Sequence, residues 1–198
     1  MGNTSSAEIK ASIIIAKNKI LLMRNKKVNS LQAKEKELVK FVQEKNLEVA
    51  KAKMRAVLIE ENLIAVYDTI VPLMDIIREK LSLMMYQNKK CPDEIQPLLE
   101  TIIYASLRIE VEELHKLRNI TSQQYGEAFV AQAAEDVKGM VNPVVKEKLN
   151  MEQIGEAMLM IKLKQLALKN NVQLDDNNYY GNILHNVNDW NQKNPYES

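Results

Sequence analysis

The sequence predicts an all-α protein, and three observations point to that class. Only 5 Gly and 5 Pro occur in 198 residues, whereas β-sandwiches and barrels need turn residues every few positions. Aromatic residues make up 5% of the chain, so the core must be built from aliphatic side chains and methionine, which suits packed helices. Apolar residues also recur at helical spacing through long stretches without Gly or Pro. The length allows one domain with a tail.

Two long helices come first. From about residue 8 to residue 46, Ile13, Ile20 and Leu31 recur on one side of a helix of roughly 55 to 60 Å. A second helix is expected from about 47 to 87, with a kink at Pro72, which has no amide donor. We expect the two to form a hairpin whose apolar faces are covered by the rest of the chain.

Shorter helices follow a break at 88–93. They are expected at Ile95–Leu107, Val111–Gln124, Pro143–Leu149 and Met151–Asn170. The chain is therefore divided into an N-terminal arm (1–7), a helical domain (8–173) and an Asn-rich, mostly disordered tail (174–198).

The net charge of +1 conceals a gradient along the chain. Residues 1–55 carry 13 basic and 5 acidic side chains, and the remainder carries 14 basic and 21 acidic ones. This polarity favours binding of an anionic surface by one end and head-to-tail association between copies or with a basic partner. The alternative is a solvated helix face.

The first helix also has a mixed face. Ile15, Lys19, Leu22 and Lys26 fall together, opposite the apolar positions given above. Alternating basic and apolar groups are typical of a helix that lies on anionic lipid, although coverage by another helix explains Ile15 and Leu22 equally well. The residues predicted to contact a membrane or a polymer are Lys17, Lys19, Arg24, Lys26, Lys27 and Lys34.

The first six residues fit the pattern for N-myristoylation. Gly2 is the acylation position, and Ser6 supplies the required hydroxyl residue. The alternative is that Ser5 or Ser6 caps the first helix. One myristoyl chain anchors a protein only marginally, so the basic segment from Lys10 is the second signal that it needs.

The last helix carries two apolar stripes about 150° apart. One stripe consists of Ile154, Met158, Ile161 and Leu168, and the other of Leu159, Leu163 and Leu166. One stripe is enough for docking onto the bundle. The set Leu159, Leu163 and Leu166 is predicted to help form a groove for an amphipathic helix of a partner, and the alternative is a helix buried on both sides.

Nothing in the sequence favours catalysis or a metal site. The phosphate-binding, dinucleotide-binding, nucleophile-elbow and zinc-protease patterns do not occur, so we expect no enzyme activity and no cofactor. With one Cys and two His, Cys91 has no disulfide partner within the chain and no zinc site is expected. No secretory signal or apolar run of membrane-spanning length is present, which predicts a cytosolic chain.

Several segments carry a resemblance to a known family. The most specific part is Tyr125-Gly126 with Phe129, followed by Val141-Asn142 and the Lys146–Leu149 segment. The other matching parts are the long basic first helix and the segments Ala52–Arg55, Ser106–Arg108, Glu112–Leu114, Leu117–Ile120 and Lys164–Val172. Over residues 8–173, the chain resembles the Increased Sodium Tolerance family of ESCRT-III-related proteins.

That resemblance implies an ESCRT-III-like helical bundle, in which shorter helices pack on a long hairpin and the last helix folds back. It implies self-assembly into filaments that remodel endosomal membranes during multivesicular body formation. A charged multivesicular body protein is the expected co-polymer, and its C-terminal helix is expected to dock near the second and last helices.

One departure from the family concerns the AAA ATPase that disassembles the filaments. A motif resembling Leu-x-x-Arg-Leu-x-x-Leu recruits the ATPase, and none occurs in 171–198, so contact of the ATPase with this chain is expected to be indirect.

From the resemblance as a whole, we expect a cytoplasmic protein, peripheral at endosomal membranes and without a nucleic-acid partner. The alternative is a soluble helical adaptor that binds acidic protein or nucleic acid through its basic first helix.

Overall fold

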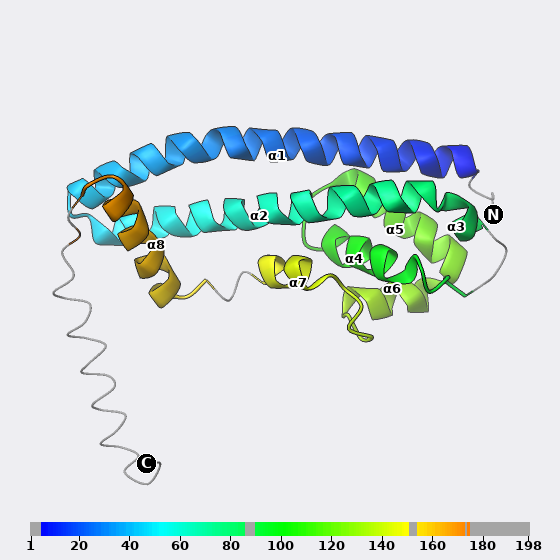
Figure 1. Cartoon of the computed structure of the whole chain (residues 1–198). Helices are drawn as coiled ribbons and strands as arrows, with labels where there is room; N and C mark the ends of the chain where they lie inside the picture. The colour runs from blue at the N-terminus through cyan, green and yellow to red at the C-terminus, as the bar shows by residue number, and fades with distance from the viewer. Residues whose placement is uncertain (1–4, 86–89, 151–153, 173, 175–198) are drawn as a thin grey trace, which may run out of the picture. The chain divides into compact units, whose positions relative to one another are not determined.

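The computed structural model describes residues 5–85, 90–150, 154–172 and 174, and this part of the chain is helical, with no strand. Eight helices occur in it: α1 (Ser6–Gln43), α2 (Leu47–Glu79), α3 (Leu81–Met85), α4 (Gln96–Ser106), α5 (Glu112–Tyr125), α6 (Glu127–Ala134), α7 (Pro143–Leu149) and α8 (Glu156–Lys169). Figure 1 shows α1 and α2 as two long neighbouring helices. The all-α prediction is confirmed.

Chain contacts divide the molecule into two compact units. Unit 1 combines residues 1–33 with 56–154, and unit 2 combines residues 34–55 with 155–198. Gly2 and the tail from residue 175 lie outside the described residues, so neither acylation nor tail disorder is tested. The single helical domain over 8–173 stays a prediction.

The start of α1 is set by a capping box. The Ser5 hydroxyl accepts the Glu8 amide over 3.2 Å, and the Glu8 carboxylate accepts the Ser5 amide over 2.7 Å. These two hydrogen bonds lower the pKa of Glu8, the one to the Ser5 backbone most. The structure thus confirms the reading of Ser5 as the cap of the first helix.

Unit 1 is built on an apolar core between α1, α2, α4 and α5. Ile13 and Ile20 of α1 are buried, as their spacing predicts, and so are Tyr67 and Ile70 of α2. α4 is buried along most of its length, because other helices cover more than one of its sides. Burial of this aliphatic surface is the main force that holds the shorter helices on the hairpin.

Unit 2 contains the turn of the hairpin together with α8. The turn is a Schellman motif, in which the Asn46 amide donates to the Phe41 carbonyl and the Lys45 amide donates to that of Val42. Lys45 adopts the left-handed conformation with φ 57°, which is usually left to Gly. Leu38, Val42, Ala50 and Met54 are buried near this turn.

Two expectations about helix limits are corrected. The second helix does not continue to residue 87, because a turn at Lys80 separates α2 from α3. The helix α6 was not expected as a separate element; Gly126, with φ 91°, ends α5 and begins α6. α2 is assigned as one helix through Pro72.

Candidate functional site

The outer face of α1, in unit 1, carries the first candidate surface. We define it as Ile15, Lys19, Leu22 and Lys26. Ile15 is 55% exposed and Leu22 is 51% exposed, and both lysines are exposed as well. The predicted division of α1 into a buried side and a mixed outer side is therefore confirmed, and in this chain no helix of the described part covers Ile15 or Leu22.

Other basic residues of α1 are paired with α2 within unit 1. Lys17 Nζ lies 2.6 Å from Asp75 Oδ2, and the Arg24 guanidinium binds both oxygens of Asp68 over 2.7 and 3.2 Å. Lys27 Nζ is 3.8 Å from Glu60 Oε1. Hydrogen bonding to Asp68 raises the pKa of Arg24. These pairs fix the register of the hairpin, and their charge is already balanced by carboxylates.

Only part of the predicted basic set therefore faces solvent. No ion pair reaches Lys19 or Lys26 within the described residues, and both remain exposed. Lys34 is half-buried and belongs to unit 2. A contact with a membrane or a polymer stays a prediction for the whole set of Lys17, Lys19, Arg24, Lys26, Lys27 and Lys34. Lys19 and Lys26 are its best-placed members, because they are exposed and have no carboxylate partner in the described residues.

The second candidate surface lies on α8 in unit 2. Leu159, Leu163 and Leu166 are 1%, 0% and 8% exposed, so they face the interior of this unit, and their role in a groove for a partner helix stays a prediction. They are buried because α8 needs one apolar face to cover the apolar side of the hairpin turn. Ile154, from the other stripe, is buried too.

The open side of α8 is formed by the remainder of that other stripe. We define the outer stripe of α8 as Met158, Ile161 and Leu168, which are 45%, 56% and 77% exposed. The helical periodicity of the sequence predicted these residues as one of the two stripes. It could not predict which stripe is buried, because burial depends on packing against helices far away in the chain.

Ion pairs at both ends hold α8 in unit 2. Near its start, Glu156 lies 3.1 Å from Lys51 of α2, and near its end Lys169 lies 3.7 Å from Glu35 of α1. Lys51 also contacts Glu48 over 3.0 Å. Its pKa is raised, mainly by the hydrogen bond to Glu48 and further by Glu156. Figure 1 shows α8 beside the hairpin turn.

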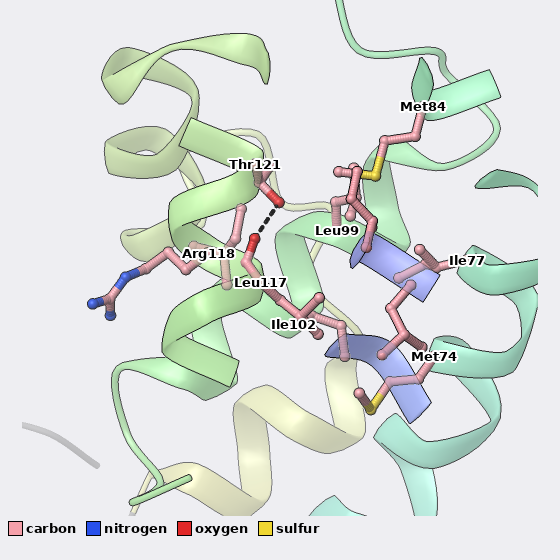
Figure 2. Close-up of a pocket in the computed structure, with 11 residues that line it drawn as sticks. Met74, Ile77, Met84, Leu99, Ile102, Leu117, Arg118 and Thr121 are labelled. Atoms are coloured by element: carbon pink, nitrogen blue, oxygen red, sulfur yellow. Dashed lines mark hydrogen bonds between the residues drawn. The ribbon is translucent and has the colours of Figure 1, made fainter. Parts of the chain in front are cut away.

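A small pocket in unit 1 offers no chemistry. Its cavity volume is about 10 Å³, which is room for about one water molecule, and its lining is mainly aliphatic, with Met74, Ile102 and Leu117 among the lining residues. In Figure 2 the Thr121 hydroxyl donates to the Leu117 carbonyl, over 2.8 Å, and the Arg118 guanidinium points away from the pocket. We interpret it as a packing gap.

The described residues contain no group of three or more His, Cys, Asp or Glu side chains that could hold a metal ion. None of the helices in the described ranges combines the length and the apolar character needed to cross a bilayer.

Comparison with known proteins decides the family. A family model described as "Ist1: Regulator of Vps4 activity in the MVB pathway" matches residues 10–173. The chain belongs to the Ist1 family. This family is regulatory and ESCRT-III-like, and the resemblance found in the sequence is confirmed.

Two relatives of this Ist1-family chain are informative. An IST1-like protein of Dictyostelium discoideum is 24% identical over 174 residues, which are 88% of this chain and 47% of that protein. This chain thus spans about half the length of that relative. A crystal structure of the S. cerevisiae Ist1 N-terminal domain in complex with the Did2 MIM motif matches with a TM-score of 0.75 and 14% identity, over 89% of this chain and 97% of the yeast chain. The fold is therefore that of the Ist1 N-terminal domain.

Proposed function

We propose that this chain is a non-enzymatic, ESCRT-III-related subunit that takes part in membrane remodelling during multivesicular body formation. The family match over residues 10–173 supports the pathway. The observation that carries the proposed mechanism is the outer face of α1, where exposed Lys19 and Lys26 alternate with exposed Ile15 and Leu22.

This face suits the surface of an anionic membrane. Lysine ammonium groups bind lipid phosphates, while Ile15 and Leu22 lose exposed apolar area when they enter the interface. Because α1 presents both kinds of group on one side, a single helix face is enough for contact. Endosomal association of the protein follows from this contact and from the pathway of the family.

The proposed partners are copies of this chain and a charged multivesicular body protein. The yeast Ist1 domain of similar fold was solved with the Did2 MIM motif. On this chain we place the docking of such a partner helix on the outer stripe of α8, because its apolar residues recur at the spacing of a helix-in-groove contact. In this proposal the chain regulates Vps4 activity indirectly, as one subunit of the assembly with these partners.

The membrane contact is tested by sedimentation of the full chain with liposomes rich in phosphatidylserine. The variant Lys19→Glu/Lys26→Glu is expected to reduce the apparent membrane affinity at least about 30-fold at low salt, since each lysine near an anionic surface contributes about 1 kcal/mol. The matched control is Lys36→Glu/Lys40→Glu, which reverses two other exposed lysines of α1.

Equal loss of binding in both variants would show a general charge effect and contradict the proposed face. Unchanged binding in Lys19→Glu/Lys26→Glu would remove that face from the mechanism. Strong binding of RNA without binding of liposomes would favour the adaptor hypothesis instead.

A further inference from the structure

Another group of exposed apolar side chains lies in unit 1, where α4 and α6 end and α7 begins. We define the α6–α7 patch as Leu107, Val137, Met140 and Val144, which are 49%, 68%, 39% and 41% exposed. In Figure 1 the segment between α6 and α7 projects beyond α4, on the side away from α1 and α2. Single exposed apolar residues are ordinary, but several on one projecting segment mark a surface for contact.

The turn that carries most of this patch is held firmly by hydrogen bonds. A Schellman motif ends α6, in which the Val137 amide donates to the Gln132 carbonyl over 3.0 Å. Asp136 and Gly139 adopt left-handed conformations with φ 52° and 65°, and Asp136 accepts the amides of both Gly139 and Val141. The residue at the position of Val137 usually packs against the residue at the position of Gln132, which is polar here, so Val137 stays open to solvent.

Arg108 fixes the end of α4 against the end of α6. Its guanidinium donates to the Tyr104 carbonyl over 3.0 Å and to the Ala134 carbonyl over 3.2 Å, and it lies 3.5 Å from the centre of the Tyr104 ring. Leu107, next to Arg108, is thereby held beside the end of α6. A surface that is already ordered loses little conformational entropy when it binds.

The charges around the patch are balanced, and they lack partners. Glu135 and Lys138 stand on either side of Val137; both are exposed, and no ion pair reaches them within the described residues. Arg108 and Glu110 repeat this at the end of α4, again without an ion pair in the described part of the chain. A strongly acidic or strongly basic partner would place like charges against half of these groups. A surface with the same two charges in reverse order matches all of them.

A second copy of this chain, turned by a two-fold axis, is such a surface. We propose that two copies pair through the α6–α7 patch, with Val137 and Met140 of each copy against those of the other. Lys138 of each copy then faces Glu135 of the other. This contact closes after two copies, so it differs from head-to-tail association, which joins two different surfaces and continues. The patch is small, so the pair is weak and transient.

The pairing is tested by sedimentation equilibrium of the full chain, from about 10 µM to about 1 mM, a range that covers weak association. The mean mass is expected to rise with concentration. Val137→Asp/Met140→Asp is expected to raise the dissociation constant at least about 100-fold, because it places four carboxylates in the contact. The matched control is Ile161→Asp/Leu168→Asp, which adds the same charge to two exposed apolar residues of unit 2 and is expected to leave the constant unchanged.

A cysteine at the centre of the patch distinguishes a two-fold contact from a head-to-tail one. Only a two-fold contact brings a residue close to the same residue of another copy. Val137→Cys, treated with a mild oxidant, is therefore expected to form a covalent dimer on a non-reducing gel. The unchanged chain, whose Cys91 is buried, and Ile161→Cys are the controls and are expected to stay monomeric on the gel.

Exchange of charges tests which residues face each other. Lys138→Glu and Glu135→Lys are each expected to weaken pairing about tenfold, because two pairs of like charges then meet across the axis. An equimolar mixture of these two variants is expected to recover pairing, and so is Glu135→Lys/Lys138→Glu, because opposite charges meet again in both. Recovery in neither would overturn the proposed facing of Lys138 and Glu135.

A chain that stays monomeric up to about 1 mM overturns the proposal. Association that the patch variant and its control weaken equally also overturns it, as does a Val137→Cys chain that forms no covalent dimer. The contact requires neither a membrane nor another protein, so it fails separately from the proposed function. Loss of liposome binding by Lys19→Glu/Lys26→Glu, with the dissociation constant of the pair unchanged, supports both.

Discussion

Asp136, at the end of α6, pairs with Lys146 of α7. The carboxylate of Asp136 is buried, with Oδ2 accepting a hydrogen bond from Lys146 Nζ and Oδ1 accepting the Val141 amide over 3.0 Å. Beside this pair, Asn142 caps α7 by accepting the amides of Val144 and Val145. Side-chain hydrogen bonds therefore hold the segment between α6 and α7 at both of its ends, through Asp136 at the first and Asn142 at the second.

The variant Asp136→Asn is expected to destabilise the protein by about 1 kcal/mol, because it removes the charged hydrogen bond but leaves an oxygen for the Val141 amide. Asn also tolerates the left-handed conformation, φ 52°, of residue 136. Urea unfolding at neutral pH, followed by circular dichroism, measures the difference. Equal midpoints for the two proteins would contradict the expectation.

The same pair predicts a dependence of stability on pH. Burial by itself raises the pKa of Asp136, but the hydrogen bonds from Lys146 and Val141 outweigh it, so the pKa lies below its ordinary value. The unfolded chain then takes up the proton first as the pH falls. The contribution of Asp136 is complete above its unfolded pKa and is lost as the pH falls through the folded one, so Asp136→Asn is expected to show a smaller loss of stability in acid.

Much of the fold was predictable because the helices are long and strongly periodic. α2 begins and α7 begins and ends at the predicted residue, α4 and α5 lie within one residue of the predicted ranges, and α1 lies within three. Helix ends were harder, because this chain closes helices with non-glycine residues. Lys45, Asp136 and Asn171 all adopt left-handed conformations at Schellman turns, so the usual glycine signal is missing there.

The candidate surfaces were predictable to different degrees. The outer face of α1 followed from the periodicity of one helix. Pairing of Lys17 with Asp75 and of Arg24 with Asp68 depends on the hairpin register, although both pairs lie equally far from Asn46 along the chain. The buried stripe of α8 could not be chosen from the sequence, since both stripes are apolar and only packing distinguishes them.

Cys91 is expected to be an unreactive thiol. It is 4% exposed, and burial raises its pKa from 9.0 to about 12. Because thiolate is the reactive form, modification by a disulfide reagent at pH 8 is expected to be at least about 100-fold slower in the native protein than in urea. Absorbance of the released thiol measures both rates, and similar rates would contradict the burial of this side chain.

The raised pKa of Cys91 also has a consequence in alkali. Above pH 9 the unfolded chain loses the thiol proton and the folded chain keeps it, so stability is expected to fall as the pH rises from about 9 towards about 12. Cys91→Ala should lower stability at neutral pH, where it removes buried apolar contacts, but should flatten this alkaline slope. Chemical unfolding at several alkaline pH values measures the slope.

The ion pair between Glu156 and Lys51 is expected to hold the first turn of α8. Glu156→Lys places like charges together and removes a carboxylate that suits a helix start, so amide exchange in that turn should become about two- to threefold faster. Lys51→Glu/Glu156→Lys reverses the pair and should recover part of the protection. Exchange followed by mass spectrometry separates the outcomes, and equal rates in all three proteins would show that the pair contributes nothing.

The opposite sides of α8 give the sharpest test of its packing. Leu163 is fully buried, so Leu163→Ala is expected to cost about 2–5 kcal/mol through lost apolar contacts and the cavity that it leaves. Ile161→Ala, two residues away on the outer stripe, should change stability by less than about 0.5 kcal/mol. Because amide exchange reports local opening as well as global unfolding, exchange within α8 is the appropriate measurement. Faster exchange in Ile161→Ala than in Leu163→Ala would contradict the packing of α8 through Leu163.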